Sequence, residues 1–385
     1  MSVLTSRPGL RWLVPTAAAA TVLGGSLVGT LIASADPTLP PRSAAQLLVD
    51  LQNARVDGLS GTVVQRADLG LPALPRGAGA GSADLTSLIS GTNTLRIWYA
   101  GPDQTRLAVL GTLGETDVIR DGDDVWIWES RHNTATHLSM PDRRSGAAPP
   151  PSLPTPLPSG LPGGLPSTFP KTPQEAADAA LAALDPSTVV TTAGSAKVAG
   201  RSAYELVLAP RDTGSLVREV RLAIDAEEHV PLRVRVLARG APEPVFEVAF
   251  DQVSFARPDP AWFRFNPPPG AKVTDGTAGP GGRAPSAPDL PTGSPEPVVI
   301  GQGWTSVLVA RLPSSGSEKS PAAGPEIGGL LERLPIVSGS WGSGRLLTGK
   351  AFSALLTDDG RVLVGAVPPD RLYRAAADPA ARLGK

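Results

Sequence analysis

The chain has 385 residues and no cysteine, and its 35 basic and 36 acidic side chains leave a formal net charge of −1. The lack of cysteine excludes disulfides, thiolate metal sites and a lipid-modified N-terminal cysteine, so the protein is not itself a lipoprotein. The balanced charge gives no basic field of the kind that nucleic-acid-binding proteins carry, so we expect no nucleic-acid partner.

Residues 1–35 have the pattern of an export signal. An apolar segment over residues 12–32 follows two arginines and ends at the small-residue cleavage site Ala33-Ser34-Ala35, with the cut expected before Asp36. The segment approaches the roughly 20 residues that a membrane-spanning helix needs, so an uncleaved N-terminal anchor is the alternative. Both interpretations place the rest of the chain outside the cytoplasm, either secreted or at the cell surface.

The next hundred or so residues predict one helix followed by strands. Ser43 can cap a helix over residues 44–54, with Gln46 as the reciprocal partner of a capping box. Apolar residues at alternate positions then predict strands, over residues 61–66, 94–100, 105–111, 115–120, 123–130 and 133–139. The long insertion at 67–91 is expected to be a lid or an irregular hairpin tip.

The middle of the chain alternates between irregular and regular patterns. Residues 141–171 are rich in Pro, Ser and Gly and predict an extended insertion. Thr172-Pro-Gln-Glu175 is a second capping box, which opens a helix over residues 173–184. Alternating apolar residues predict four more antiparallel strands, over residues 204–208, 216–225, 232–238 and 245–255.

A Pro/Gly/Ser-rich linker at 276–297 separates the last part of the chain. Beyond it the pattern predicts strands, a short helix, a hairpin and a terminal helix, over residues 298–312, 327–334, 352–357 with 361–367, and 368–377.

Several motifs resemble the LolA-like family, which contains the lipoprotein carrier LolA and the RseB/MucB regulators of extracytoplasmic sigma factors. They are Gly200-Arg-Ser-Ala-Tyr-Glu-Leu, Leu222-Ala-Ile-Asp, Val230-Pro-Leu-Arg and Phe263-Arg-Phe-Asn-Pro-Pro-Pro-Gly-Ala-Lys-Val, and the resemblance covers roughly residues 43–273. Two segments near the C-terminus are similar to the small C-terminal domain of the RseB/MucB proteins, which LolA lacks: Gly303-Trp-Thr-Ser-Val-Leu-Val and Arg361-Val-Leu-Val-Gly-Ala-Val-Pro-Pro-Asp-Arg-Leu.

The resemblance implies a mainly β fold with capping helices, in the α+β class. It predicts an antiparallel open half-barrel over residues 36–275, a linker over 276–297 and a small C-terminal α+β domain over 298–385. The concave face of the half-barrel would be apolar and covered by the two predicted helices.

Function follows from the same resemblance. It implies a non-enzymatic protein that binds acyl chains or a lipidated peptide on the concave face, where burial contributes roughly 0.8 kcal/mol per methylene. One alternative is an RseB/MucB-like negative regulator that binds a membrane anti-sigma factor. Another is a cell-surface structural module without a ligand.

The alternating strands supply the candidate lining of the lipid cavity. The predicted residues are Leu95, Ile97, Tyr99, Leu107, Val109, Trp126, Trp128, Tyr204, Leu206, Leu208, Val220, Leu222, Ile224, Val234, Val236, Phe246 and Val248.

No motif indicates catalysis, a metal or a cofactor. There is no Gly-x-Ser-x-Gly elbow, and the three histidines lie in or beside predicted turns. The acidic cluster around Asp121 lacks the later glutamate of a calcium loop. Residues 344–350 match the glycine and lysine spacing of a phosphate-binding loop, but Ala351 stands where Ser or Thr would bind magnesium, so a glycine-rich turn is the better interpretation.

Overall fold

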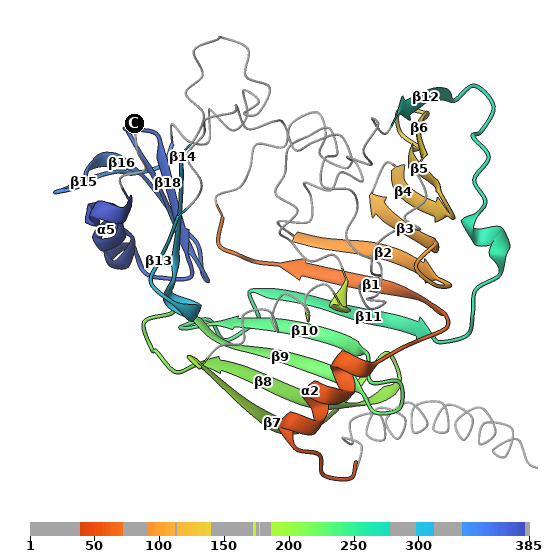
Figure 1. Cartoon of the computed structure of the whole chain (residues 1–385), viewed down its shortest axis with the longest axis horizontal. Coiled ribbons are helices and arrows are strands. Elements are labelled where there is room, and N and C mark those ends of the chain that lie inside the picture. Colours follow the sequence, from red (N-terminus) through yellow and green to blue (C-terminus); the bar gives the residue numbers. More distant parts are fainter. Residues whose placement is uncertain are drawn as a thin grey trace, which may run out of the picture.

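The computed structural model describes residues 39–71, 91–111, 114–139, 172–174, 177, 186–277, 298–311 and 333–381. Within them the chain forms a twelve-stranded sheet and a separate six-stranded sheet (Figure 1). The predicted export signal, the greater part of the insertion at 67–91, the insertion at 141–171 and most of the linker at 276–297 lie outside the described residues. Among the residues that are described, no helix is long and apolar enough to cross a membrane.

The large sheet is open and almost wholly antiparallel. Across the sheet the strands follow the order β12 (Lys272–Thr277), β6 (Thr134–Ser139), β5 (Asp124–Glu129), β4 (Gly114–Asp121), β3 (Gln104–Gly111), β2 (Gly91–Tyr99), β1 (Leu59–Ala67), β11 (Phe246–Ser254), β10 (Pro231–Ala238), β9 (Val217–Asp225), β8 (Arg201–Pro210) and β7 (Thr188–Val198). β12 runs parallel to β6, and every other neighbouring pair is antiparallel. The predicted fold class, a mainly β protein with an open half-barrel, is confirmed.

The sequence patterns missed both edge strands of this sheet. β7 contains the run Thr191-Thr-Ala-Gly-Ser195, in which polar and small residues break the apolar alternation. β12 extends into the first residues of the predicted linker. An edge strand pairs on one side only and needs less burial, so its apolar pattern is weak.

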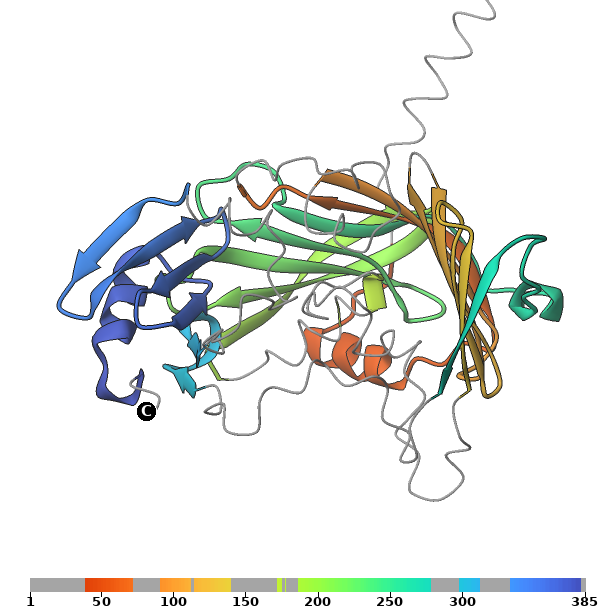
Figure 2. The same ribbon diagram turned by 90° about the horizontal axis from the view of Figure 1, so that it is seen from above.

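Helix α2 (Ala44–Asn53) has the predicted capping box. The Ser43 side chain accepts from the backbone N–H of Gln46, and the Gln46 side chain reaches back to the Ser43 N–H at 2.9 Å. Leu47 and Leu51 lie one turn apart and are buried in the core of the large sheet. Figure 2 shows α2 inside the curve of the sheet.

The predicted helix at 173–184 is described only at its beginning. Pro173, Gln174 and Ala177 are helical, and Ala177 is fully buried in the same core as α2. The remainder of this helix lies outside the described residues.

A bulge in β11 sharpens the bend between the two halves of the large sheet. The register shifts by one residue between Thr62 and Val63, which leaves an extra residue on β11. A Cβ on Gly61 would lie 2.4 Å from the carbonyl oxygen of Gln252, so glycine is required where the two strands come this close.

The C-terminal sheet has the order β13 (Val298–Ile300), β14 (Val307–Arg311), β18 (Arg361–Gly365), β17 (Ser353–Thr357), β16 (Gly342–Thr348) and β15 (Ile336–Gly339). The predicted hairpin is β17 and β18, and the predicted terminal helix is α5 (Pro369–Ala377). β15 and β16 were not predicted, and the expected helix at 327–334 lies almost wholly outside the described residues. α5 packs Leu372, Ala375 and Ala376 against one face of this sheet and forms a second core.

The two sheets touch through several separate contacts. The N–H of Leu216 donates to the carbonyl of Ala366 at 2.7 Å, and the indole N–H of Trp304 donates to the Thr188 hydroxyl at 2.8 Å. The N–H of Lys350 donates to the carbonyl of Leu69 at 2.8 Å. One end of the large sheet is therefore held against the C-terminal sheet.

Candidate functional site

The concave face of the large sheet is a continuous apolar surface. Directly opposed residues in neighbouring antiparallel strands point to the same face, so the register can be followed across the sheet from β3 to β8. It joins all but two of the predicted lining residues on the face that also packs against α2: Leu95, Ile97, Tyr99, Leu107, Val109, Tyr204, Leu206, Leu208, Val220, Leu222, Ile224, Val234, Val236, Phe246 and Val248.

The register places Trp126 and Trp128 on the opposite face, so the prediction that they line the concave cavity is corrected. Trp126 of β5 pairs with Ile119 of β4, and Ile119 pairs with Arg106 of β3. Arg106 in turn pairs with Trp98 of β2, so all four side chains are on one face. Trp98 alternates with the concave-face residue Ile97. β5 is apolar on both faces, and alternation alone could not decide which face turns inward.

On this convex face the tryptophans have partners from the segment between β11 and β12. Phe265 lies 5.3 Å from Trp126 and 5.8 Å from Trp128 between ring centroids. Trp262 stacks on Trp98 at 4.9 Å. The aromatic residues therefore fasten this connecting segment onto the back of the sheet.

Helix α2 covers only part of the concave face. Its main contacts are with β7 and β8, at one edge of the sheet. The face continues from there through β9, β10, β11, β1 and β2 to β3. The contacts of α2 therefore explain burial at one edge of this face only, and central residues such as Leu95 and Val248 are fully buried as well.

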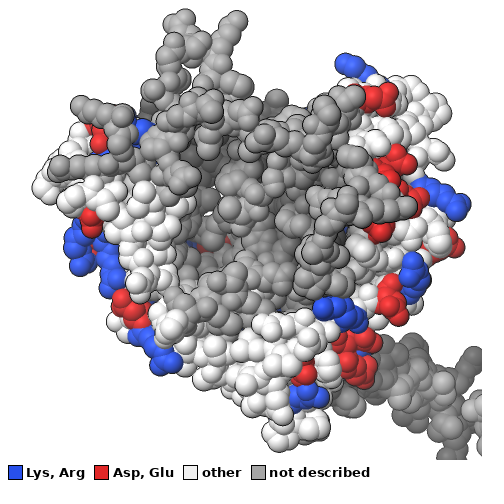
Figure 3. Space-filling view, in the orientation of Figure 1, with Lys and Arg blue, Asp and Glu red and all other residues white. Residues whose placement is uncertain are grey.

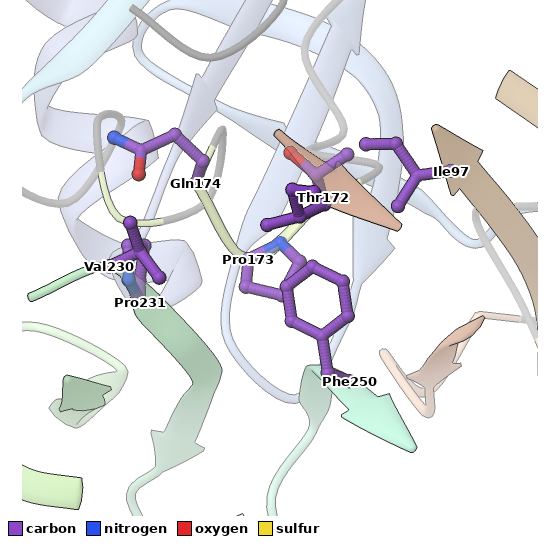
Figure 4. A pocket seen from close by; sticks show the side chains of 8 residues that line it. Ile97, Thr172, Pro173, Gln174, Val230, Pro231 and Phe250 are labelled. Atoms are coloured by element: carbon purple, nitrogen blue, oxygen red, sulfur yellow. The ribbon is translucent and has the colours of Figure 1, made fainter. Parts of the chain in front are cut away.

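A small pocket lies where this surface meets the beginning of the second helix. It is lined by Leu59, Ile97 and Phe250 from the sheet, by Val230 and Pro231 before β10, and by Thr172, Pro173 and Gln174. Figure 4 shows Pro173 directed toward the ring of Phe250. The enclosed space holds about one water molecule and is almost wholly apolar.

One polar side chain interrupts the apolar surface, and the sequence analysis missed it. Gln65 of β1 is on the concave face between Val63 and Ala67, opposite Val248 of β11. It is fully buried, and neither its amide oxygen nor its amide nitrogen has a hydrogen-bond partner. Leaving a buried polar group without a hydrogen bond lowers the free energy of unfolding by about 1–3 kcal/mol. A polar residue in phase with the apolar positions of a strand is the signal that could have found it.

The convex face of β8 to β11 carries a ladder of ion pairs. Glu205 accepts from Arg233 at 2.8 Å, and Glu247 accepts from Arg235 at 2.8 Å and from Arg66 at 2.9 Å. Burial lowers the pKa of Arg233, the charge of Arg235 acts in the same direction, and Glu205 opposes them. Figure 3 shows acidic and basic side chains intermixed around the outside of the molecule in that view.

The buried carboxylates of Asp225 and Asp117 differ in how many hydrogen bonds they accept. Burial alone would raise the pKa of Asp225, but hydrogen bonds from Arg201 and from the N–H groups of Glu228 and Glu227 lower it overall. Burial raises the pKa of Asp117, although Arg106 donates to one of its oxygens. The other Asp117 oxygen is buried without a partner.

The residues considered for metal or phosphate chemistry have structural roles. In the described part of the chain no group of three or more His, Asp or Glu side chains could hold a metal ion. Residues 342–348 form strand β16, so the interpretation of 344–350 as a glycine-rich turn is wrong in detail. Lys350 follows this strand and pairs with Asp68 at 2.5 Å.

The fold and the site define a class of protein: an open half-barrel that presents an apolar concave face. The family model of the MucB/RseB N-terminal domain matches residues 88–258. This segment is therefore similar to the N-terminal domain of the MucB/RseB proteins, which supports the resemblance to the LolA-like superfamily. A search of curated proteins finds no significant match.

A comparison with solved structures finds similar chains at low sequence identity. The chain is similar to MucB in the Pseudomonas aeruginosa MucA/MucB complex, with 16% identity, 86% of this chain and 96% of that chain covered, and a TM-score of 0.42. An uncharacterised conserved protein from Thermus thermophilus has 12% identity over 60% of this chain and 98% of its own, with a TM-score of 0.31. A LolA superfamily protein from Nitrosomonas europaea has 10% identity over 58% of this chain and 99% of its own, with a TM-score of 0.22.

Proposed function

We propose that the protein is an extracytoplasmic, non-enzymatic binding protein whose concave face takes acyl chains of lipids or lipoproteins. The observation that carries this proposal is the extent of the concave apolar surface compared with the short helix α2 at its edge. The residues of this face are buried in the structure, so a bound chain would replace the groups that now cover them. The match of residues 88–258 to the MucB/RseB N-terminal domain supports a binding function of the LolA/RseB type.

Burial of the chain would supply the affinity. Each methylene transferred from water contributes roughly 0.8 kcal/mol, so a long acyl chain needs no covalent bond and few polar contacts. The curved sheet would surround an elongated ligand, with α2 at one edge and Pro173 beside the small pocket.

The test is organic extraction and mass spectrometry of gently purified protein. We expect lipid to co-purify with the wild type. Leu222→Asp and Val234→Asp should remove it, because each places an unpaired charge on a fully buried part of the face. Gln252→Asp, at an exposed position of β11, is the matched control and should retain lipid.

Protein that contains no lipid and gives no saturable signal with a fluorescent fatty acid would contradict the proposal. A dry structural module at the cell surface would then remain.

A second candidate function is regulation of a membrane partner, which the resemblance to the RseB/MucB proteins implies to be an anti-sigma factor. The C-terminal sheet favours it, since this sheet carries the two segments similar to the RseB/MucB C-terminal domain. We also propose that residues 298–385 are a domain, because their sheet and α5 enclose a separate core.

Deleting residues 298–385 should abolish capture of the membrane partner and leave the half-barrel folded, as judged by circular dichroism. Separately expressed 298–385 should also be folded. Recovery of the same membrane protein with and without these residues would favour a carrier over a regulator.

A further inference from the structure

Gln65 has no structural partner that explains its place on the concave face. Its side chain is fully buried among apolar neighbours from β1 and β11, and both polar atoms of its amide lack partners. Asn93 is opposite in β2, yet neither atom of the Gln65 amide forms a hydrogen bond. A leucine or methionine would fill this position without the loss of two hydrogen bonds.

The position of Gln65 along β1 gives the site a direction. Leu59, Gly61, Val63 and Gln65 follow one another on the same face, and Leu59 lines the pocket beside Pro173. From Leu59 to Gln65 the strand rises by about 20 Å at ~3.3 Å per residue. An acyl chain spans about 15 Å in one leaflet of a bilayer whose hydrocarbon core is about 30 Å thick. The length of one acyl chain therefore matches the distance from Leu59 to Gln65, and because both residues are buried without ligand, a bound chain would displace the groups that now cover them.

Gln65 is the polar point of this path. The next residue on the same face is Ala67, which is buried and apolar, and the exposed Asp68 that follows alternates to the other side and pairs with Lys350. At the other end the lining of the pocket is almost wholly apolar. A ligand with one apolar and one polar end would place its tail at Leu59 and its head at Gln65.

We propose that the Gln65 amide binds the carbonyl group of an ester or amide at the head of an acyl chain. This proposal rests on the proposed function, because it assumes that the concave face takes the chain. A glutamine amide offers two N–H donors and one carbonyl acceptor. An ester carbonyl can accept from the N–H group, and a ligand amide can also donate to the Gln65 oxygen. Both unsatisfied atoms can therefore gain partners from the ligand.

The test compares ligands that differ only at the head. Methyl palmitate, N-methylpalmitamide and hexadecane compete with a bound fluorescent fatty acid for the wild type and for Gln65→Met, which keeps the length of the side chain and removes its polar atoms. We expect the wild type to bind the ester or the amide about tenfold more tightly than the hydrocarbon, as one added hydrogen bond would give. In Gln65→Met this ratio should fall to about one, with hexadecane bound as well as before.

A second readout separates this role from a purely structural one. Without ligand, Gln65→Met should have a higher melting temperature than the wild type, because it removes the unsatisfied amide. With methyl palmitate the wild type should gain more in melting temperature than the variant. A merely structural glutamine would give the variant a lower melting temperature and leave the ratio of affinities unchanged.

The outcomes distinguish the two proposals. A wild type that binds hexadecane and the two polar ligands equally would overturn the role of Gln65 and leave lipid binding standing, and this arm needs no variant to fold. A wild type that binds none of the three would overturn lipid binding and the role of Gln65 together. A preference for the ester indicates a glycerolipid ligand, and a preference for the amide indicates an N-acylated protein.

Discussion

The two sheets of this protein are built from the same local pattern, and they use their apolar faces differently. In the C-terminal sheet, α5 lies on the central strands β17 and β18 and buries Leu355, Leu363 and Leu372 completely. In the large sheet, α2 lies near the edge on β7 and β8, and the apolar face extends across many more strands. One helix can seal a narrow sheet but only part of a wide, curved one. Both faces are buried, but in the large sheet a single edge helix explains only part of that burial, which makes this face the candidate binding surface.

The strongest way to break this comparison is a charge in the smaller core. Leu363→Asp should destabilise the C-terminal sheet by several kcal/mol, because an unpaired buried carboxylate has no compensating partner. The large sheet should keep its lipid, in contrast to Leu222→Asp. Circular dichroism combined with lipid extraction measures both effects. Equal loss of lipid in the two variants would show that the faces are one functional unit.

A buried arginine also holds the C-terminal core together. The Arg361 guanidinium is nearly inaccessible and donates to the carbonyls of Ala376 at 3.0 Å and Ala381 at 3.4 Å, besides its pairing with Asp359. We expect Arg361→Met to lower the free energy of unfolding by about 3 kcal/mol in urea denaturation, since hydrogen bonds to charged groups contribute about 1.5–3 kcal/mol each.

Arg374→Met is the matched control for Arg361→Met. Arg374 belongs to α5, which packs on β18, but its ion pair with Asp370 is exposed and should contribute little. If both variants lose a similar amount of unfolding free energy, the buried contacts of Arg361 are not the cause of its destabilisation.

The large sheet offers an internal comparison between Asp225 and Asp117. The pKa of Asp225 is below its ordinary value of 3.8, so its stabilising effect is present above that pH and is lost as the pH falls through the lowered pKa. Asp225→Asn should therefore cost about 2 kcal/mol at neutral pH, and the cost should shrink in acid.

Asp117 should behave in the opposite way. Its pKa is raised, so the stability linked to it is complete below the ordinary value and is lost as the pH rises through the raised pKa. Asp117→Asn should cost less than about 1 kcal/mol at neutral pH, because the carboxylate is only half satisfied. Urea denaturation at several pH values tests both variants. Identical pH profiles would contradict the difference in their hydrogen bonds.

The smallest effect is expected where the two sheets meet. Lys350→Ala removes a largely exposed ion pair with Asp68 and leaves the backbone hydrogen bond to Leu69 in place. Its free energy of unfolding should stay within about 0.5 kcal/mol of the wild type in thermal denaturation. A large decrease in the free energy of unfolding would mean that the Lys350–Asp68 ion pair, rather than the backbone contacts, couples the two sheets.

Much of this molecule could be predicted from local patterns. Alternation of apolar residues located most of the central strands, and Ser43 with Gln46 located α2, because pleat and capping depend on residues close in sequence. The same alternation placed Leu206, Leu222 and Val234 together on one face. The motif near Gly200 lies within the segment that matches the MucB/RseB N-terminal domain, residues 88–258.

The tertiary structure decided what depends on pairing between distant segments. Which face of β5 turns inward follows from the register through β2, β3 and β4, so Trp126 and Trp128 could not be assigned from β5 alone. The edge strands β7 and β12 are set by their neighbours more than by their own residues. Gln65 is polar in the sequence, and only the pairing of β1 with β11 and β2 places it on the concave face, where it is buried without a partner. Local chemistry thus determined the strands, and long-range register and burial determined the faces and the candidate site.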